Sequence, residues 1–189
     1  MTQIRGFAIR GLLHYAKSKG LSPTHLVTEL PATASPVFAR QIFHSELYPY
    51  EGFVELVHLL ERRLGAPLGI DAGTFAHELG RAAAREDIKG IFQVAALLSS
   101  PEKAVHRAPT YWARYCDTGT MVEQEIRPGY FRMALEGFPG IDPLHCRLIE
   151  GWNEGGIDSV WGTKNVQVKQ VECVHRSGTR CVFEGKWEG

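Results

Sequence analysis

The spacing of apolar residues changes at Gly119, and this change limits the chain to one class of fold. Before Gly119, apolar side chains recur at helical spacing, as in Phe53, Leu56, Val57 and Leu60. After it, short runs of alternating polar and apolar residues are separated by turn residues, a pattern typical of β-hairpins. Helices and strands that do not alternate along the chain indicate an α+β fold with an antiparallel sheet.

The length of 189 residues suits one domain with a sizeable core. We expect a single α+β domain over residues 1–189, in which a mainly helical lobe over 1–118 precedes an antiparallel sheet over 119–189. Ser-Pro pairs supply an N-cap and a proline at the first helical position before several of the helical segments. The expected helices of the lobe cover 6–19, 23–30, 36–43, 49–65, 72–86, 88–98 and 101–116.

The second part of the chain predicts the order ββαββ. The expected strands are 120–126, 130–138, 165–175 and 180–188, with the turn 127–129 in the first hairpin and a helix over 142–154 between the two hairpins. Gly155 and Gly156 predict the end of that helix. Glu150, Glu154 and Asp158 are then expected at an exposed helix end.

The charge balance argues against nucleic acid and membrane surfaces as partners. The chain has 21 Lys and Arg and 21 Asp and Glu, so its net charge of zero does not favour binding to nucleic acid or to a membrane surface. No run approaches 18 consecutive apolar residues, and the N-terminus lacks the apolar core of a signal peptide. We therefore expect a cytoplasmic protein whose four cysteines are more often free or metal-bound than paired in disulfides.

The segment ECVHRSGTRC (172–181) places two cysteines on either side of a turn. A three-residue loop with Gly178 in the left-handed region would set Cys173 opposite Cys181, whereas a two-residue loop would send them to opposite faces. We favour the three-residue loop because it gathers the apolar residues of the hairpin on one face. These residues are Val171, Cys173, Cys181 and Phe183.

Two opposed thiolates are close enough to share a zinc ion, because directly opposed Cβ atoms lie ~4.5–5.5 Å apart. Cys146, on the expected helix 142–154, is the natural third ligand, and the fourth ligand stays open. The candidates for it are Glu172, His145, His175 and Gln170. Two further interpretations stay open as well: Cys173 and Cys181 as small buried apolar side chains, or as a disulfide.

The sequence contains none of the common catalytic motifs. A Walker loop, GxGxxG, HExxH and GxSxG are all absent, and His77-Glu78 has no second histidine at the zincin spacing. The charged run 84–89 reads as a solvated helix face. We therefore expect that the protein is not an enzyme.

Several segments together resemble a known family. They are IRGFAIRGLLHYA, LYPYEGFVELVHLLERRLG, the run from FAHELGR to YCDTG, GFPG, and the closing ECVHRSGTRCVFEGKW. The chain resembles, over nearly its whole length, a myxobacterial family of unknown function related to the vinyl-reductase-type domain. That domain is similar to the haem-NO-binding domain and to small subunits of vesicle-tethering complexes. The resemblance implies helices and an antiparallel sheet that enclose a ligand pocket.

The resemblance also bears on metals and cofactors. In phenol-sensing bacterial regulators this kind of domain holds zinc with three cysteines and a glutamate. The last two cysteines match the spacing of Cys173 and Cys181, and Cys146 falls about where the first would lie, but Gln170 stands where the glutamate would be. Haem-NO sensors use a Tyr-x-Ser-x-Arg clamp that this chain lacks, so haem is not expected, and His77 is the histidine that we would test first.

We expect a non-enzymatic sensor or signalling module that binds a small apolar or aromatic ligand and passes its state to a partner protein. The expected pocket residues are Phe92, Trp112, Tyr115, Phe131 and Trp152. The alternative is an adaptor or dimerising scaffold without a ligand, with aromatics of 44–53 as a contact if they are exposed. The third function considered is a haem-binding gas sensor. Zinc is the cofactor that the cysteines allow, and a partner protein or a homodimer is the expected assembly.

Overall fold

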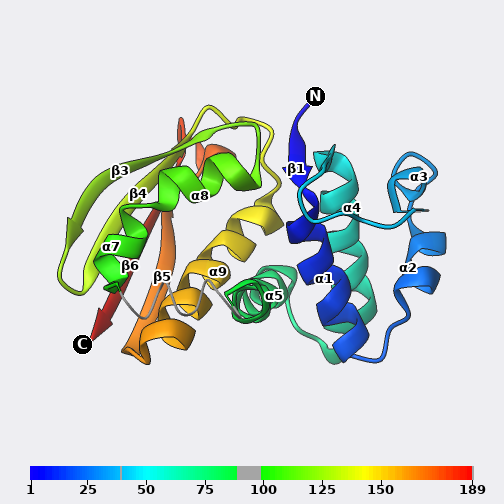
Figure 1. Cartoon of the computed structure of the whole chain (residues 1–189), viewed down its shortest axis with the longest axis horizontal. Helices are drawn as coiled ribbons and strands as arrows, with labels where there is room; N and C mark the ends of the chain where they lie inside the picture. The colour runs from blue at the N-terminus through cyan, green and yellow to red at the C-terminus, as the bar shows by residue number, and fades with distance from the viewer. Residues whose placement is uncertain (39, 89–98, 189) are drawn as a thin grey trace.

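The computed structural model describes residues 1–38, 40–88 and 99–188. Figure 1 shows a four-stranded sheet on one side, a group of helices on the other, and the long helix α9 (Pro143–Trp161) between them. The predicted α+β class with an antiparallel sheet is therefore confirmed. Most of the helix expected over 88–98, including Phe92, lies outside the described residues.

The helical lobe follows the predicted pattern over most of its length. Its helices before residue 88 are α1 (Gly6–Ser18), α2 (Pro23–Glu29), α3 (Ser35–Phe38), α4 (Tyr50–Leu60) and α5 (Ala72–Asp87). The helix expected over 36–43 was too long, because the backbone N–H of Phe43 donates to the Tyr48 hydroxyl at 2.9 Å and not to a helical carbonyl. No helix in the part of the chain that the structure describes is long and apolar enough to cross a membrane.

The segment expected as one helix over 101–116 forms two, α7 (Pro101–Val105) and α8 (Ala108–Tyr115). Pro109 explains the break, because proline has no N–H with which to bond to the carbonyl of Val105 one turn earlier. Because of this break, α8 runs in a different direction from α7, on the sheet side of the molecule (Figure 1).

A small two-stranded sheet was not predicted. It pairs β1 (Gln3–Arg5) with β2 (Leu47–Pro49) in antiparallel register, and Ile4 also bridges to Cys116. The two strands have three residues each, too short for a period-two pattern to be seen in the sequence.

The main sheet has the strand order β3-β4-β6-β5, with each neighbouring pair antiparallel. The strands are β3 (Thr120–Arg127), β4 (Tyr130–Glu136), β5 (Lys164–Glu172) and β6 (Cys181–Glu188). Together with α9 they give the predicted order ββαββ. The β3–β4 loop is shorter than expected, since Arg127 pairs with Tyr130 across the two residues Pro128 and Gly129.

Helix α9 does not end before its two glycines, and the expected boundary at 154 was wrong. The glycines lie where α9 crosses α5, and a Cβ at Gly155 would lie 2.7 Å from the carbonyl oxygen of Arg81. At Gly151 the corresponding distance to the carbonyl oxygen of His77 is 1.8 Å. Packing between the two helices therefore outweighs the low helix propensity of glycine.

The tip of the second hairpin differs in part from the predicted loop. Glu172 pairs with Val182, and this register, continued by one residue, places Cys173 opposite Cys181 as expected. The turn itself is a 3₁₀ segment, Val174–Arg176, and Ser177 has the positive φ of 64° that was expected at Gly178. A bulge between Gln170 and Glu172 also turns Val171 outward, so Val171 is 47% exposed and does not face Phe183.

We expect Gly151→Ala to lower the free energy of unfolding by about 1–3 kcal/mol, because its Cβ would overlap the α5 backbone. Urea unfolding measures this loss. Gly156→Ala is the matched control on the same helix, because its nearest neighbour is the flexible end of Ile88 at 3.2 Å. Equal losses in the two variants would contradict a backbone contact at Gly151.

Candidate functional site

An apolar cavity of about 310 Å³ lies where α5, α8 and α9 meet. Apolar and aromatic side chains form most of its wall, to which α1 contributes Phe7, α7 contributes Val105 and β3 contributes Met121. The volume lies at the lower end of the range for small-molecule sites. The aromatic wall residues from α8 and α9 are Tyr111, Trp112, Tyr115, Trp152 and Trp161.

Three of the expected pocket residues, Trp112, Tyr115 and Trp152, line this cavity. Phe131 does not, and its inclusion was wrong. Its ring covers Gly185 on the neighbouring strand and lies 6.2 Å from the ring of Trp187. Phe92 lies outside the described residues.

The cavity wall also carries charged groups that the sequence did not assign to it. Asp87, expected on a solvated helix face, accepts a hydrogen bond from Trp152 Nε1 at 3.0 Å. Burial raises the pKa of Asp87 to about 6. His44, Arg107 and Arg114 also line the cavity and are exposed.

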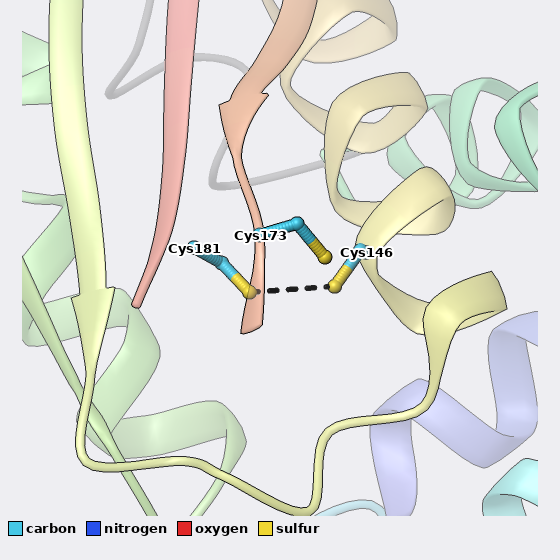
Figure 2. A group of neighbouring side chains, drawn as sticks. All are labelled: Cys146, Cys173 and Cys181. Atoms are coloured by element: carbon cyan, nitrogen blue, oxygen red, sulfur yellow. Dashed lines mark hydrogen bonds between the residues drawn. The ribbon is translucent and has the colours of Figure 1, made fainter. Parts of the chain in front are cut away.

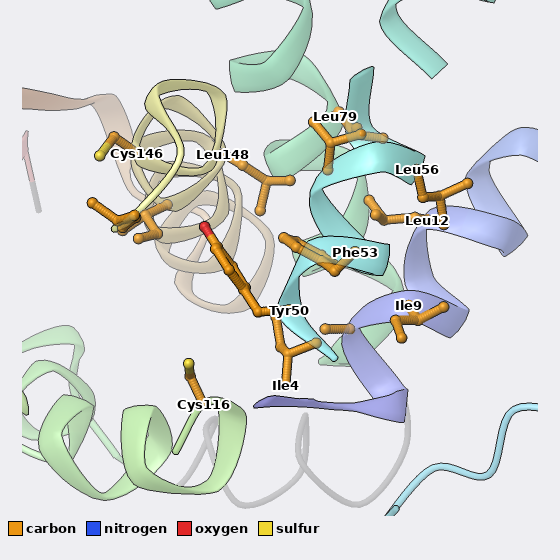
Figure 3. Close-up of a cluster of buried hydrophobic side chains, with 14 of the residues drawn as sticks. Ile4, Ile9, Leu12, Tyr50, Phe53, Leu56, Leu79, Cys116, Cys146 and Leu148 are labelled. Carbon is orange, nitrogen blue, oxygen red and sulfur yellow. The ribbon is translucent and has the colours of Figure 1, made fainter. Parts of the chain in front are cut away.

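Beside the cavity, three polar side chains form a hydrogen-bonded row, in which Tyr50 and His145 are buried and Tyr115 is half-buried. Tyr50, at the start of α4, points its hydroxyl toward α9 (Figure 3) and lies 2.9 Å from Nδ1 of His145. Nε2 of the same imidazole lies 3.2 Å from the hydroxyl of Tyr115, which lines the cavity. His145 is 1% exposed, and burial lowers its pKa to about 3, so the ring is neutral.

A cluster of three cysteines lies on the other side of α9, next to the sheet. The sulfur atoms of Cys146, Cys173 and Cys181 all lie within 4.8 Å of one another, and all three residues are buried. Figure 2 shows Cys146 reaching from α9 toward the two hairpin cysteines. The Sγ atoms of Cys146 and Cys181 are 3.7 Å apart. The structure thus brings together the three cysteines that the sequence suggested as zinc ligands.

The thiols differ in acidity because they share a hydrogen bond. The contact with Cys146 lowers the pKa of Cys181 to about 6, and the same contact, together with burial, raises the pKa of Cys146. A thiolate on Cys181, accepting from the Cys146 thiol, is the arrangement that this contact stabilises. Thiolates are the form of cysteine that binds zinc.

Of the proposed fourth ligands, Glu172, His145 and His175 do not belong to this sulfur cluster in the described structure, whereas the Gln170 side chain makes a hydrogen bond with Cys146. His145 is engaged by the two tyrosines, and Nε2 of His175 contacts the carbonyl oxygen of Ile141 at 2.6 Å. Glu172 lies 3.8 Å from the Arg180 guanidinium. His175 is nevertheless beside the cluster, because its backbone N–H lies 3.4 Å from Cys173 Sγ.

The carboxylates expected at an exposed helix end are instead packed against neighbouring elements. Glu150 is 1% exposed and accepts from the backbone N–H of Gln170 and from the Arg147 guanidinium. Glu154 and Asp158 both lie near Arg81 of α5, at 3.6 Å each. Burial raises the pKa of Glu150. These groups join α9 to its neighbours and do not form a carboxylate row in solvent.

The sequence also singled out His77, as the histidine to test for haem, and the aromatics of 44–53, as a contact if they are exposed. His77 lies 3.5 Å from Glu154 on α9 and does not line the cavity. In the segment 44–53, Tyr48 and Tyr50 are 1% and 5% exposed, so neither can serve as an exposed aromatic contact.

We expect the free energy of unfolding to decrease as the pH is lowered, because His145 is buried in its neutral form. The unfolded chain takes up a proton on this ring near pH 6.5, whereas the folded chain takes it up only near pH 3, so the stabilisation is complete above pH 6.5 and decreases below it. Between pH 6.5 and 5 the free energy of unfolding should fall by about 2 kcal/mol more than in His145→Gln. Chemical denaturation across this range measures the difference, and parallel curves would exclude His145 as the cause.

Comparison with known proteins identifies the fold. No protein-family model and no curated protein sequence matches the chain. Among solved structures, an H-NOX protein of Shewanella oneidensis in the Fe(II)NO state is similar with a TM-score of 0.73, at 12% identity, covering 98% of this chain and 100% of that one. An unliganded Fe(II) H-NOX protein of K. algicida gives a TM-score of 0.68, at 10% identity and 98% and 97% coverage.

An oxygen-binding H-NOX domain related to soluble guanylate cyclases is also similar, with a TM-score of 0.62, 11% identity and 97% and 93% coverage. The expectation that haem is unlikely was therefore wrong: the solved structures that share this fold are haem-binding H-NOX domains, although the chain lacks the Tyr-x-Ser-x-Arg motif. The chain has the H-NOX fold over nearly its whole length.

Proposed function

We propose that the protein is a sensor that binds a small, largely apolar molecule in the cavity between α5, α8 and α9. The apolar cavity of about 310 Å³ is the observation that carries the proposal. Burial of apolar ligand surface would supply the affinity, at roughly 25 cal/mol per Å² removed from water. A core without such a cavity would have favoured the alternative function, an adaptor or scaffold without a ligand.

The position of the cavity supports signalling by a shift between two conformations. Its wall draws on α1, α5, α8, α9 and β3, so a ligand would contact both the helical lobe and the sheet side. A ligand that binds one arrangement of these elements more tightly shifts the population toward it. We propose that this shift is read by a partner protein or a second copy of the chain, and that the protein acts by binding and not by catalysis.

Haem is a second candidate ligand, favoured by the haem-binding proteins of the same fold. The cavity wall contains the residue types that hold this group: a histidine, His44, for the iron, and Arg107 and Arg114 for the propionate carboxylates. Aromatic side chains such as Trp112 provide flat apolar walls. Bound haem would supply an iron centre that takes a diatomic gas.

We also propose that the cysteine cluster binds zinc. Three buried thiols within 4.8 Å of one another match the sulfur ligands of structural zinc sites, and binding would tie the hairpin to α9. The imidazole of His175 is a candidate for the fourth ligand, because the backbone N–H of the same residue donates to Cys173 Sγ. Rotation of its ring away from the Ile141 carbonyl would be required.

The cavity is tested by filling it. We expect Ala108→Trp, whose new side chain would enter the cavity, to abolish ligand-induced thermal stabilisation in a screen of hemin and small aromatic compounds. Ala113→Trp is the control, because Ala113 is exposed on the same helix and does not line the cavity. A Soret band after reconstitution with hemin would identify haem as the ligand. If the ligand still stabilises the Ala108→Trp variant, the ligand binds outside the cavity.

The zinc site is tested by elemental analysis of protein purified without chelator. We expect about one zinc per chain, reduced to well below half in Cys181→Ser. Cys116→Ser is the matched control, because Cys116 is also buried but is absent from the cluster. Equal zinc content in both variants would exclude the cluster as the binding site.

A further inference from the structure

The row formed by Tyr50, His145 and Tyr115 contains more donor hydrogens than its own contacts can use. The backbone N–H of Asp142 donates to the Tyr50 hydroxyl at 3.0 Å. Tyr50 and His145 share a second hydrogen bond and His145 and Tyr115 a third, at 2.9 and 3.2 Å. A neutral imidazole has one N–H and one acceptor nitrogen, so the direction of both bonds follows from the position of a single hydrogen.

Two arrangements satisfy the three contacts. In the first, Tyr50 donates to Nδ1, the Nε2–H of His145 donates to Tyr115, and the hydroxyl hydrogen of Tyr115 is left over. In the second, Nδ1–H donates to Tyr50, Tyr115 donates to Nε2, and the hydroxyl hydrogen of Tyr50 is left over. The two arrangements fit the same three distances equally well. The surroundings of the two tyrosine hydroxyls therefore determine which arrangement is more stable.

An unpaired hydroxyl hydrogen is less favourable on Tyr50 than on Tyr115. It is 5% exposed, and its ring lies 5.1 Å from that of Phe138 and 6.0 Å from that of Phe53. No further acceptor contacts its hydroxyl among the described residues. A buried donor without a partner is unfavourable, because it has lost its hydrogen bond to water and gains none in the protein. Tyr115 instead lines the cavity, where a bound molecule can accept its hydrogen.

We infer that Tyr115 donates its hydroxyl hydrogen to an oxygen of the cavity ligand, and that the ligand is a largely apolar or aromatic molecule with a carbonyl group. The inference rests on the proposed function, because it assigns the chemistry of a ligand in the same cavity. His145 holds the phenol oxygen by donating to it and leaves the phenol hydrogen directed away from the imidazole.

A matched pair of probes tests the inference. Acetophenone and α-methylstyrene have nearly the same shape, and only acetophenone carries a carbonyl oxygen. In titrations followed by calorimetry or NMR, Tyr115→Phe should weaken acetophenone binding about fivefold and leave α-methylstyrene binding unchanged. Tyr15→Phe is the control, because Tyr15 of α1 does not line the cavity, so both probes should bind this variant as they bind the unaltered protein.

The outcomes separate the two levels of the proposal. If both probes bind and Tyr115→Phe weakens neither selectively, the inference about Tyr115 fails while the cavity function stands. If neither probe binds the unaltered protein, the inference about the carbonyl ligand fails, and the cavity function is decided by the thermal-shift screen with hemin and Ala108→Trp. Nitrogen chemical shifts of the His145 ring give a readout without any ligand: the Nε2–H tautomer is expected, and the Nδ1–H tautomer would overturn the inference.

Discussion

Helices α5 and α9 cross with their backbones in contact, and the positions of the other elements depend on this crossing. It requires glycine on both helices, since a Cβ at Gly80 or Gly151 would lie about 2 Å from a carbonyl oxygen of the other helix. Charged side chains lie at the same crossing, where Arg81 of α5 approaches Glu154 and Asp158 of α9. Such partly buried charges need partners, and their pairing fixes how far one helix can slide along the other.

The cavity follows from the way α8 approaches this pair of helices. Because the chain breaks before Pro109, α8 can turn Trp112 and Tyr115 toward α9. The Trp112 Nε1–H donates to the carbonyl of Thr118 at 3.0 Å, and the Tyr115 hydroxyl contacts His145, so both aromatic rings are held from their polar ends. The wall is therefore built from large side chains in fixed orientations, and such rings resist collapse into the space between them.

The sequence predicted the parts of the fold that depend on local patterns. Hydrophobic spacing located α1, α4 and α5, and alternation located both hairpins. The errors arose where long-range packing determines the secondary structure. The glycines that were expected to end α9 lie against α5, and the two short strands β1 and β2 are paired with each other. Sequence patterns carry little information about such contacts, because the deciding partner lies 40 or more residues away.

The candidate sites were predictable to different degrees. The hairpin register could be derived from side-chain alternation, and it placed Cys173 near Cys181 correctly. The pocket prediction missed Asp87, although Gly80, Ala83 and Asp87 share one face of α5 at helical spacing and the first two are buried. The row of Tyr50, His145 and Tyr115 could not have been derived, because it joins three separate helices. Haem was discounted on a missing motif, whereas the fold is shared by haem-binding proteins.

Consecutive residues at the start of α9 belong to the two sites. His145 faces Tyr50 and Tyr115 beside the cavity, and Cys146 faces the hairpin sulfurs on the other side of the helix. Successive residues of a helix point about 100° apart, so a rotation of this turn that brings one side chain toward its partners displaces the other. The contact of α9 with α5 holds the later turns of the helix, from Leu148 to Gly155, and leaves the first turn as the part where cavity and hairpin meet. A change in the hydrogen bonds of His145 and a change in the contacts of the Cys146 thiol thus act on the same helical turn.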